Sequence, residues 1–180
     1  PVQLVKKPAS PPGRNRILSE EEELRLLDAS MPLANRNIYT RPFIIVALET
    51  AMRRSEILSL RWQDLNFAKR TAFLKMTKNG ESRTVPLSSR AIETLDALPR
   101  RDGANVFAVN FPALENNFKR ARVRAGLENL RIHDLRHTAA TRLAEKLSNV
   151  LELSAVTGHK QLNMLRRYYH PKAEMIALKL

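Results

Sequence analysis

The stretch that decides the fold is TAFLKMTKNGESRTVPL, residues 71–87. Every second residue from Ala72 to Met76 is apolar, and this alternation is the signature of a half-buried strand. An Asn-Gly pair follows at positions 79 and 80, and such pairs are typical of short hairpin turns. Residues 82–87 supply the return strand, and Pro86 places that strand at a sheet edge or a strand end. The stretch therefore predicts one small antiparallel sheet.

The sequence on either side of the hairpin has the pattern of helices. Ser19 and Glu22 form a capping-box pattern, so a helix is expected from there to about residue 30. Pro42 suits the first turn of a second helix, whose residues 43–51 are apolar on nearly all sides and should be buried. Further helices are expected at residues 55–62, 89–98, 113–125, 133–146, 149–157, 162–169 and 172–180. The predicted fold class is mainly α with a small antiparallel β-sheet (α+β).

The composition limits the kind of molecule that the chain is expected to bind. The chain has 180 residues, enough for one well-packed domain, and 43% of them are hydrophobic, which argues against general disorder. Lysine and arginine number 31 against 18 acidic residues, a formal net charge of +13. Such an excess attracts polyanions, so nucleic acid is the favoured partner over a ribosome-associated or merely basic protein. An aromatic content of 6% favours duplex over single strands, because single-strand binders need stacking surfaces.

Three absences narrow the class of protein further. The chain contains no cysteine, which excludes disulfide frameworks and cysteine-based metal sites and is compatible with a cytosolic protein. Its longest apolar stretch, residues 43–48, is followed by Glu49 and is too short to cross a membrane. The sequence begins at Pro1 with no signal segment, so we expect a fragment of a larger protein and not an exported one.

Residues 1–16 are rich in proline and basic residues and are predicted to form an extended linker. Four basic side chains lie in it, namely Lys6, Lys7, Arg14 and Arg16. They either follow a phosphate backbone or remain solvated on a tether. The sequence leaves both interpretations open.

The segment His133-Asp134-Leu135-Arg136-His137 carries the clearest chemical signal. On a helix, His133 and Arg136 share one face, and an arginine beside a histidine suits a phosphate. One alternative is an ordinary helix start, with Asp134 favourably placed for the helix dipole. Another is a zinc pair formed by His133 and His137. The zinc interpretation is weaker, because Asp134 is a short acid for that motif and no third ligand stands out.

Three other signals are weak when each is taken alone. Arg53 and Arg54 follow the buried helix, and either one of them is rigidly held or both are surface charge. Lys78 precedes the hairpin turn, where its amine either swings to a ligand or protects a sheet edge. Tyr168 and Tyr169 lie in a basic stretch, where such a tyrosine is either a phosphate-attacking nucleophile or an aromatic packed under arginine stems.

The order and spacing of these signals resemble the tyrosine recombinases of the phage integrase family, from about Ile17 to the C-terminus. The most specific feature is the H-D-L-R-H-T/S box, complete at residues 133–138, together with a tyrosine further on. The other family boxes resemble T-G-L/M-R-x-x-E, T-K-N/T-G with V-P-L, G-H, and R-Y-x-H. Here they read Thr50-Ala51-Met52-Arg53-Arg54-Ser55-Glu56, Thr77-Lys78-Asn79-Gly80 with Val85-Pro86-Leu87, Gly158-His159, and Arg167-Tyr168-Tyr169-His170.

The resemblance implies a tyrosine recombinase catalytic-domain fold over residues 17–180. It also implies that residues 1–16 are a linker from a missing N-terminal DNA-binding domain. The implied catalytic residues would surround one DNA phosphate, and they are Arg53, Lys78, His133, Arg136, His159 and Tyr168. Glu56 is similar to the acid that supports the first arginine.

The implied reaction is the cleavage and rejoining of DNA strands through a covalent 3′-phosphotyrosine. The two arginines would stabilise the charge that develops on the phosphate, and His159 would hold a phosphate oxygen. Tyr168 would attack the phosphorus while His133 accepts or relays its proton, and Lys78 would protonate the departing 5′ oxygen. No metal, ATP or other cofactor is expected, because arginine and lysine do the work that magnesium does elsewhere.

The resemblance also implies partners and a location. Double-stranded DNA is the expected substrate, and self-association into a tetrameric synapse is expected on it, with no membrane partner. A cytoplasmic, DNA-associated protein of bacterial or phage origin is implied. The helix at residues 172–180 is expected to dock on a neighbouring subunit, although packing on its own core is the alternative.

Two other functions stay open at this point. A type IB topoisomerase has a similar site but relaxes supercoils as a monomer, and a DNA-binding protein of the same fold would perform no cleavage. The compact T-K-N-G hairpin and the R-Y-x-H ending favour the recombinase. Three departures from the family pattern are Ala51 in place of glycine, Thr157 where leucine is frequent, and Tyr169 beside the expected nucleophile.

Overall fold

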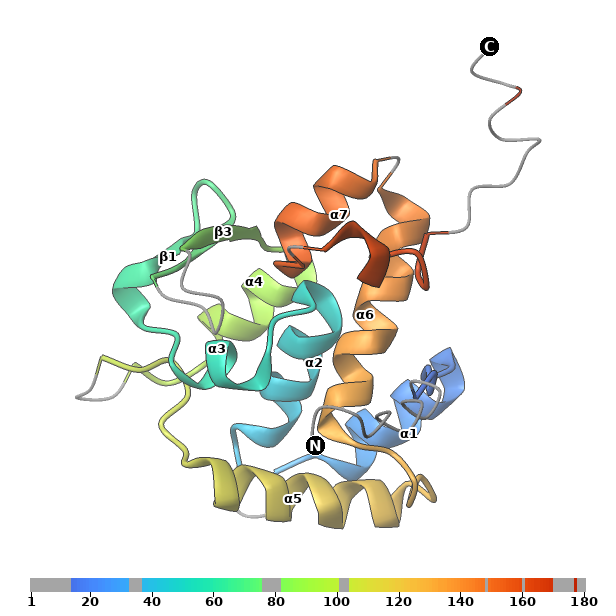
Figure 1. The fold of residues 1–180 in the computed structure, drawn as a ribbon. Helices are drawn as coiled ribbons and strands as arrows, with labels where there is room; N and C mark the ends of the chain where they lie inside the picture. Colours follow the sequence, from blue (N-terminus) through green and yellow to red (C-terminus); the bar gives the residue numbers. More distant parts are fainter. Residues whose placement is uncertain are drawn as a thin grey trace, which may run out of the picture.

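The computed structural model describes residues 14–32, 37–75, 82–100, 104–147, 149–159, 161–169 and 177. Helices dominate, with one small sheet near the middle of the chain (Figure 1). The helices are α1 (Glu20–Ala29), α2 (Thr40–Thr50), α3 (Arg54–Leu58), α4 (Ser89–Asp96), α5 (Phe111–Arg124), α6 (Ile132–Lys146) and α7 (Val150–Thr157). Two 3-10 turns, η2 (Trp62–Asp64) and η3 (Leu162–Met164), and strands β1 (Leu65–Asn66), β2 (Thr71–Leu74) and β3 (Arg83–Pro86) complete the described elements. The predicted fold class is confirmed.

Helix α2 forms the centre of the core. Its residues Phe43, Ile44 and Val46 have no exposed surface, as expected for a helix that is apolar on nearly all sides. Helices α4 and α6 pack along it, and α3 continues from its end. In Figure 1, α5 lies across the base of the molecule with α1 beside it, and α7 packs against β3 near the top. The C-terminal end of α2 is thereby brought close to both α6 and α7.

The sheet has the order β1-β2-β3 and is antiparallel throughout. Strands β2 and β3 pair with Ala72 opposite Val85, and both side chains are fully buried. The hairpin predicted from the sequence is therefore present, although its turn lies outside the described residues. Strand β1 is an addition that the sequence analysis did not foresee, because its two residues are too few to show a period.

Helix α1 begins as predicted. The Ser19 hydroxyl accepts the Glu22 N–H at 3.1 Å, and the Glu22 carboxylate accepts the Ser19 N–H at 3.0 Å. Each group satisfies a donor that a helix start would otherwise leave unpaired.

Two predicted helices differ in extent. The helix expected at residues 55–62 ends at Leu58, after which the chain turns so that the Trp62 N–H donates to the Ala104 carbonyl. The helix expected at residues 162–169 is only the short turn η3 followed by further turns. Leu165 is buried there while Leu162 and Met164 are exposed, so this segment lacks the continuous apolar face that would hold a longer helix. The predicted helix at residues 172–180 lies outside the described residues, apart from Ala177.

No helix within the described ranges is long and apolar enough to cross a membrane.

Candidate active site

The candidate site lies where α2 ends, α3 begins and α6 and α7 pack together. A cleft of about 330 Å³ opens there. Phe43, Ala47, Met52, Ile57 and Ile132 form its apolar lining, and Arg53, Arg54, Ser55, His133 and Arg136 supply its polar groups. The structure thus brings Arg53, His133 and Arg136 to one cleft, as expected from the sequence.

The break between helices α2 and α3 places Arg53 in the cleft. Ala51 ends α2 in the left-handed conformation, with φ of 51°, and Arg53 is the extended residue before α3. The left-handed conformation favours glycine, so the backbone of Ala51 adopts a conformation that is energetically unfavourable for alanine. The Ala51 side chain is fully buried and packs with Ala139 and Ala140 of α6, which fixes the turn.

Arg53 is supported by a buried carboxylate. Glu56 accepts the Arg53 backbone N–H at 2.7 Å and the Arg53 guanidinium at 2.9 Å. The position predicted to support the first arginine therefore contacts it. Burial opposes the ionisation of Glu56, but hydrogen bonds from Arg83 and from Arg53 outweigh it and hold the pKa of Glu56 below its ordinary value. Glu56 is consequently an anion at neutral pH.

Arg136 is the most deeply placed cation of the site. It lies on the inner face of α6, and its guanidinium donates to the carbonyls of Ala51 and, at 2.7 Å, Thr157. Burial, and then the charge of Arg53, lower the pKa of Arg136 to about 10. The group is still charged at neutral pH, so it brings a fixed cation to the wall of the cleft.

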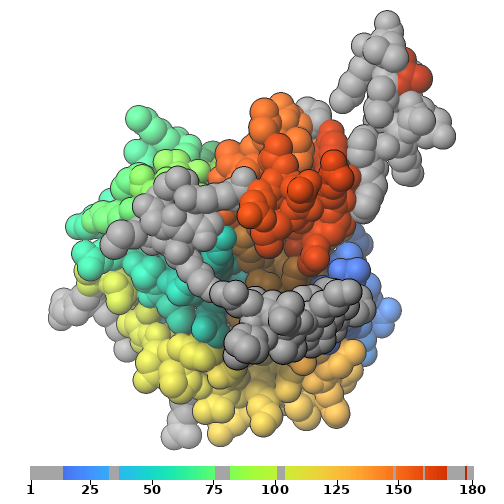
Figure 2. Space-filling view, viewed as in Figure 1, coloured from blue at the N-terminus to red at the C-terminus, as the bar shows by residue number. Residues whose placement is uncertain are grey.

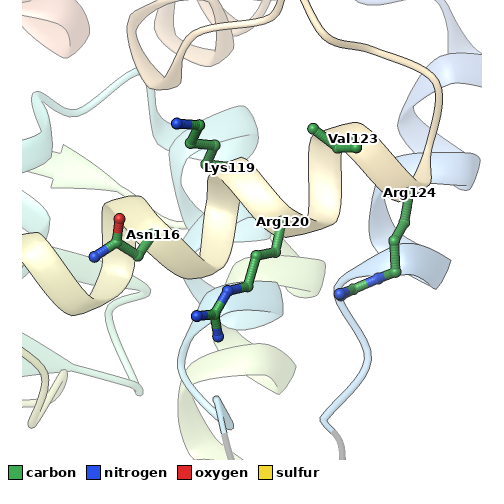
Figure 3. A pocket seen from close by; sticks show the side chains of 5 residues that line it. All are labelled: Asn116, Lys119, Arg120, Val123 and Arg124. Carbon is green, nitrogen blue, oxygen red and sulfur yellow. The ribbon is translucent and has the colours of Figure 1, made fainter.

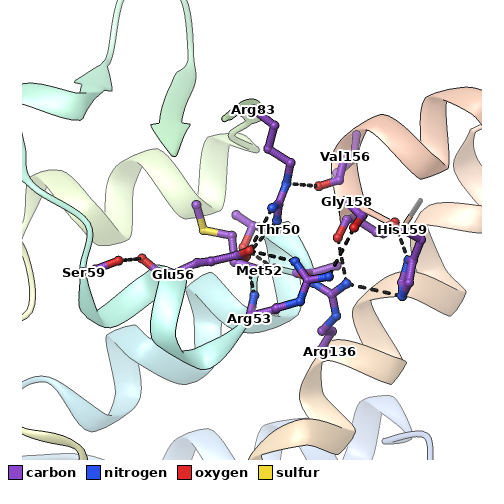
Figure 4. Close-up of polar contacts among 12 residues, drawn as sticks. Thr50, Met52, Arg53, Glu56, Ser59, Arg83, Arg136, Val156, Gly158 and His159 are labelled. Atoms are coloured by element: carbon purple, nitrogen blue, oxygen red, sulfur yellow. Dashed lines mark hydrogen bonds and ion pairs between the residues drawn. The ribbon is translucent and has the colours of Figure 1, made fainter. Parts of the chain in front are cut away.

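The last carbonyls of α7 hold three arginines from three different elements (Figure 4). Val156 accepts the Arg83 Nε at 3.3 Å, Thr157 accepts Arg136, and Gly158 accepts the Arg53 guanidinium at 3.2 Å. We call these three oxygens the α7 carbonyl cluster. Helix ends leave their last carbonyls unpaired and carry partial negative charge, which suits cations.

Gly158 is needed at the end of α7 for two reasons. Its φ of 68° is left-handed, and a Cβ built there would lie 2.8 Å from the Arg83 guanidinium. Any side chain would therefore push Arg83 away from its contacts with the α7 carbonyl cluster and Glu56.

The tautomer of His159 follows from Thr157. The Thr157 hydroxyl donates its proton to the Leu153 carbonyl at 2.6 Å and lies 2.7 Å from the His159 Nδ1. The hydroxyl has only one proton, so Nδ1 must donate and the neutral ring leaves Nε2 as an acceptor. Nε2 lies 3.4 Å from Arg136. Burial, and then Arg136 and Arg53, lower the pKa of His159 to about 4, which keeps the ring neutral.

Tyr168 lies in the turns after η3, and its ring packs against the alanine cluster of Ala51, Ala139 and Ala140. Its hydroxyl is hydrogen-bonded to the His137 Nδ1, and its ring centroid is 6.2 Å from that of His159. Burial raises the pKa of Tyr168, and Arg167 and Arg136 act in the opposite direction. The phenol is therefore neutral at neutral pH, and the cations that act on it are Arg167 and Arg136.

His133 and His137 are one turn apart on α6, with their rings edge to face at 4.7 Å between centroids. Burial, and then Arg136, lower the pKa of His133. Burial, followed by His133 and Arg167, lowers the pKa of His137 to about 4. Within the described residues, no group of three histidines and acids is placed to hold a metal ion.

Three residues matter to this site that the sequence analysis passed over. Arg83 was not singled out, although the alternation of β3 puts it on the same face as buried Val85. Thr157 was named only as a departure from the family pattern, yet it holds Arg136 and orients His159. His137 was considered only as a metal ligand, yet it contacts Tyr168. Lys78 lies outside the described residues.

Arg14 and Arg16, two of the predicted linker cations, contact the domain itself. Arg14 donates to the Asp134 carboxylate at 2.8 and 2.9 Å, and Arg16 is paired with Glu22 at 2.5 Å. Asp134 starts the helix that carries His133 and Arg136, so Arg14 joins the N-terminal segment to the candidate site.

A second basic surface lies on α5 (Figure 3). Lys119 and Arg120 project from successive positions of the helix, and Arg124 reaches toward α1, where it donates to the Ala29 carbonyl. Val123 is half exposed between them. In the space-filling view, the yellow surface of α5 lies below the teal surface of α2 and α3 (Figure 2). Exposed cations on a helix suit a phosphate backbone.

Comparisons with known proteins agree with one another. Residues 16–175 match the sequence profile of the phage integrase family. A shufflon-specific DNA recombinase of Escherichia coli is 42% identical over all of this chain and 46% of its own length. The catalytic domain of the bacteriophage HP1 integrase has a TM-score of 0.72 at 28% identity, covering 93% of this chain and 95% of the other.

A further structure is the XerH site-specific recombinase bound to its difH substrate, with a TM-score of 0.71 at 24% identity, covering 91% of this chain and 52% of the other. At that identity the likeness concerns the fold alone. The chain spans about half the length of the curated relatives it matches.

Proposed function

Because the chain belongs to the phage integrase family, we propose that it is the catalytic part of a site-specific DNA recombinase. The proposed reaction cuts and rejoins strands of duplex DNA through a covalent 3′-phosphotyrosine. The observation that carries the proposal is the meeting of Arg53, Arg136 and His133 in one cleft. Tyr168 packs close by, against Ala51 at the end of α2.

The two arginines are the proposed clamp for the scissile phosphate. A phosphodiester gains negative charge as a fifth oxygen approaches, and fixed guanidiniums stabilise that charge without having to reorganise. Arg53 and Arg136 are fixed in this way, because Glu56, Ala51 and the α7 carbonyl cluster hold them. Their positions are set before any DNA arrives.

Tyr168 is the proposed nucleophile, in preference to Tyr169. The Tyr168 ring packs against the alanine cluster between α2 and α6 and contacts His137. Both tyrosines pack against the neighbouring cluster of Ala144, Leu153 and Leu165, but of the two only Tyr168 also packs against the alanine cluster. These contacts favour the register that was predicted from the spacing of the boxes.

The histidines of the site would gain positive charge once a phosphate binds. A negative ligand raises the pKa of nearby imidazoles, so His159 would gain a proton at Nε2 and donate it to a phosphate oxygen. His133 lines the same cleft and would contact the phosphate as well. Lys78 remains the predicted donor of the proton that the departing 5′ oxygen needs, on the strength of the family resemblance.

Duplex DNA is the proposed substrate. The net charge of +13 and the exposed lysine and arginine of α5 support contact with DNA phosphates outside the cleft. We also propose that the whole protein assembles as a tetrameric synapse on DNA. The predicted linker over residues 1–16 would then lead to a second DNA-binding domain.

The test uses nicked suicide duplexes with randomised arms, incubated with this chain at low salt. A nick beside the cleaved phosphate lets a short product diffuse away, so the covalent intermediate accumulates. We expect a protein–DNA adduct that survives detergent, and sequencing of the captured DNA then reports the recombination site. Tyr168→Phe should abolish the adduct while DNA binding persists, and Tyr169→Phe should retain it. A chain that binds DNA but forms no adduct would be a binding protein of the same fold.

A further inference from the structure

We propose that His137 is a catalytic residue of the cleavage step, and that its Nδ1 accepts the phenol proton of Tyr168. The inference rests on the proposed function, since it concerns the nucleophile of that reaction. It differs from the sequence-based expectation, which gave the accepting role to His133.

The first observation is the direct contact between the two groups. The Tyr168 hydroxyl is hydrogen-bonded to the His137 Nδ1, from a segment 31 residues later in the chain. His133 is one turn earlier on α6 and presents its ring edge to face with the ring of His137, at 4.7 Å between centroids. His137 therefore lies between His133 and the phenol, and it is the imidazole that touches the reacting oxygen.

The second observation is the direction of that hydrogen bond. Arg167 is hydrogen-bonded to the Tyr168 side chain, and a guanidinium can only donate. The phenol oxygen therefore accepts from Arg167 and has its own proton left to donate. Its contact on the other side is the His137 Nδ1, whose ring is neutral at neutral pH. The phenol is thus polarised between a cation that supports its oxygen and an imidazole that can receive its proton.

The charges around His137 are consistent with this role. His133, Asp134 and Arg136 face it from α6 and Arg167 faces it from the turns after η3. Three of these four groups are basic, so an imidazolium is unfavourable in the free protein. A bound phosphodiester brings a compensating negative charge to the same cleft, which favours protonation of His137 only when substrate is present.

The step balances as follows. The Tyr168 Oη–H electron pair forms the Oη–P bond while the proton moves to the His137 Nδ1. The P–O5′ bond breaks, and the 5′ oxygen leaves with a proton supplied by Lys78 as in the proposed function. The phenol becomes more acidic as the bond to phosphorus forms, so a weak base is sufficient at that stage. In rejoining, the 5′ hydroxyl attacks the phosphorus and gives its proton back to Lys78, while the Oη–P bond breaks and His137 returns its proton to the tyrosine oxygen.

The experiment measures the rate of adduct formation on the suicide duplex captured with the wild-type chain. His137→Asn keeps an oxygen near the Nδ1 position, which can accept a hydrogen bond but cannot take up a proton. Each of the wild-type and His137→Asn proteins is prepared with tyrosine or with a more acidic fluorinated tyrosine at position 168. His133→Asn is carried through the same series as the matched control, and thermal unfolding checks that each variant is folded.

With tyrosine at position 168, we expect His137→Asn to slow cleavage about 10²-fold, the usual size of a general-base contribution. With the acidic phenol, most of that loss should disappear, because the proton leaves without help. The loss in His133→Asn should be the same for both phenols. Equal losses in His137→Asn for both phenols, or no loss, would overturn the inference while leaving the wild-type adduct intact. A wild-type chain that forms no Tyr168-dependent adduct would overturn the proposed function as well.

Discussion

Glu56 and Arg83 are joined by two hydrogen bonds, of 2.8 and 2.7 Å, between a carboxylate and a guanidinium that are both largely shielded from water. The pair connects the start of α3 to the return strand of the hairpin. It also leaves Glu56 with arginines on two sides, since Arg53 occupies the other. A buried carboxylate with two cationic partners is costly to disturb.

Removing Arg83 should therefore lower stability strongly. Arg83→Gln leaves the buried Glu56 carboxylate with Arg53 alone and removes a contact to the Val156 carbonyl. We expect the free energy of unfolding to fall by about 3 kcal/mol in urea denaturation, the lower end of the range for breaking a buried pair. Arg25→Gln is the control, since Arg25 and Glu21 are exposed and 3.9 Å apart, and it should cost less than about 0.5 kcal/mol. Equal costs for the two variants would contradict this account.

Acid should destabilise the domain through Glu56. Burial opposes ionisation of this carboxyl, but Arg83 and Arg53 hold its pKa below the ordinary value when the protein is folded. Its contribution is therefore complete above the unfolded pKa of about 4.3 and is lost as pH falls through the lower folded value. Urea midpoints measured from pH 6 downwards should fall less steeply for Glu56→Gln than for the wild-type chain, and parallel curves would refute the assignment.

The left-handed turn at Ala51 should tolerate glycine but not a branched residue. Ala51→Gly relieves the backbone but gives up a buried methyl group, and these effects are each about 1 kcal/mol and of opposite sign. Ala51→Val adds both strain and bulk beneath the Tyr168 ring, and it should cost about 2–4 kcal/mol. Chemical denaturation gives both values, and valine costing no more than glycine would show that the turn is not under strain.

The exposed cations of α5 should contribute to DNA affinity without sequence preference. Lys119→Gln and Arg120→Gln should each reduce the slope of log K against log salt by about 1, because each removes one phosphate contact. Binding titrations at several salt concentrations measure this slope. Lys69→Gln, in the turn between β1 and β2, should leave it unchanged. Wild-type slopes in both α5 variants would mean that α5 faces away from DNA.

The contact between Arg14 and Asp134 should steady the start of α6. In Arg14→Gln we expect faster amide hydrogen exchange in the first turn of α6, which carries His133. Arg16→Gln is a close control, because Arg16 is paired with Glu22 of α1 and not with α6. Unchanged exchange in the Arg14 variant would show that the N-terminal segment does not restrain this helix.

The parts of the fold that the sequence predicted are those with a strong local signal. The alternation in β2 and the capping box of α1 each report one element without help from the rest of the chain. Strand β1 was not predicted, because two residues are too few to show a periodic pattern. Residues 162–169 were wrongly predicted to form a helix, because the spacing of leucines in a turn resembles one side of a helix. In both cases distant packing decides the conformation.

The sequence predicted the side chains of the candidate site but not the backbone groups that hold them. Arg53, His133 and Arg136 stood out as residue types in order, and the cleft contains all three. The carbonyls that hold the arginines have no sequence signature, because every residue has one. Thr157 and His137 matter through what they contact, namely His159 and Tyr168, and those contacts arise only when α6, α7 and the turns after η3 meet.

The α7 carbonyl cluster has a consequence for how the site can fail. One short helix end accepts hydrogen bonds from cations on a strand, at the start of α3 and in the second turn of α6, so the three share one support. A tilt of α7 would remove this shared support from all three at once and leave Arg53 and Arg83 to Glu56 and Arg136 to the Ala51 carbonyl. Substitutions among Arg53, Arg83 and Arg136 would then be strongly non-additive, since the first loss already loosens the scaffold on which the other two depend.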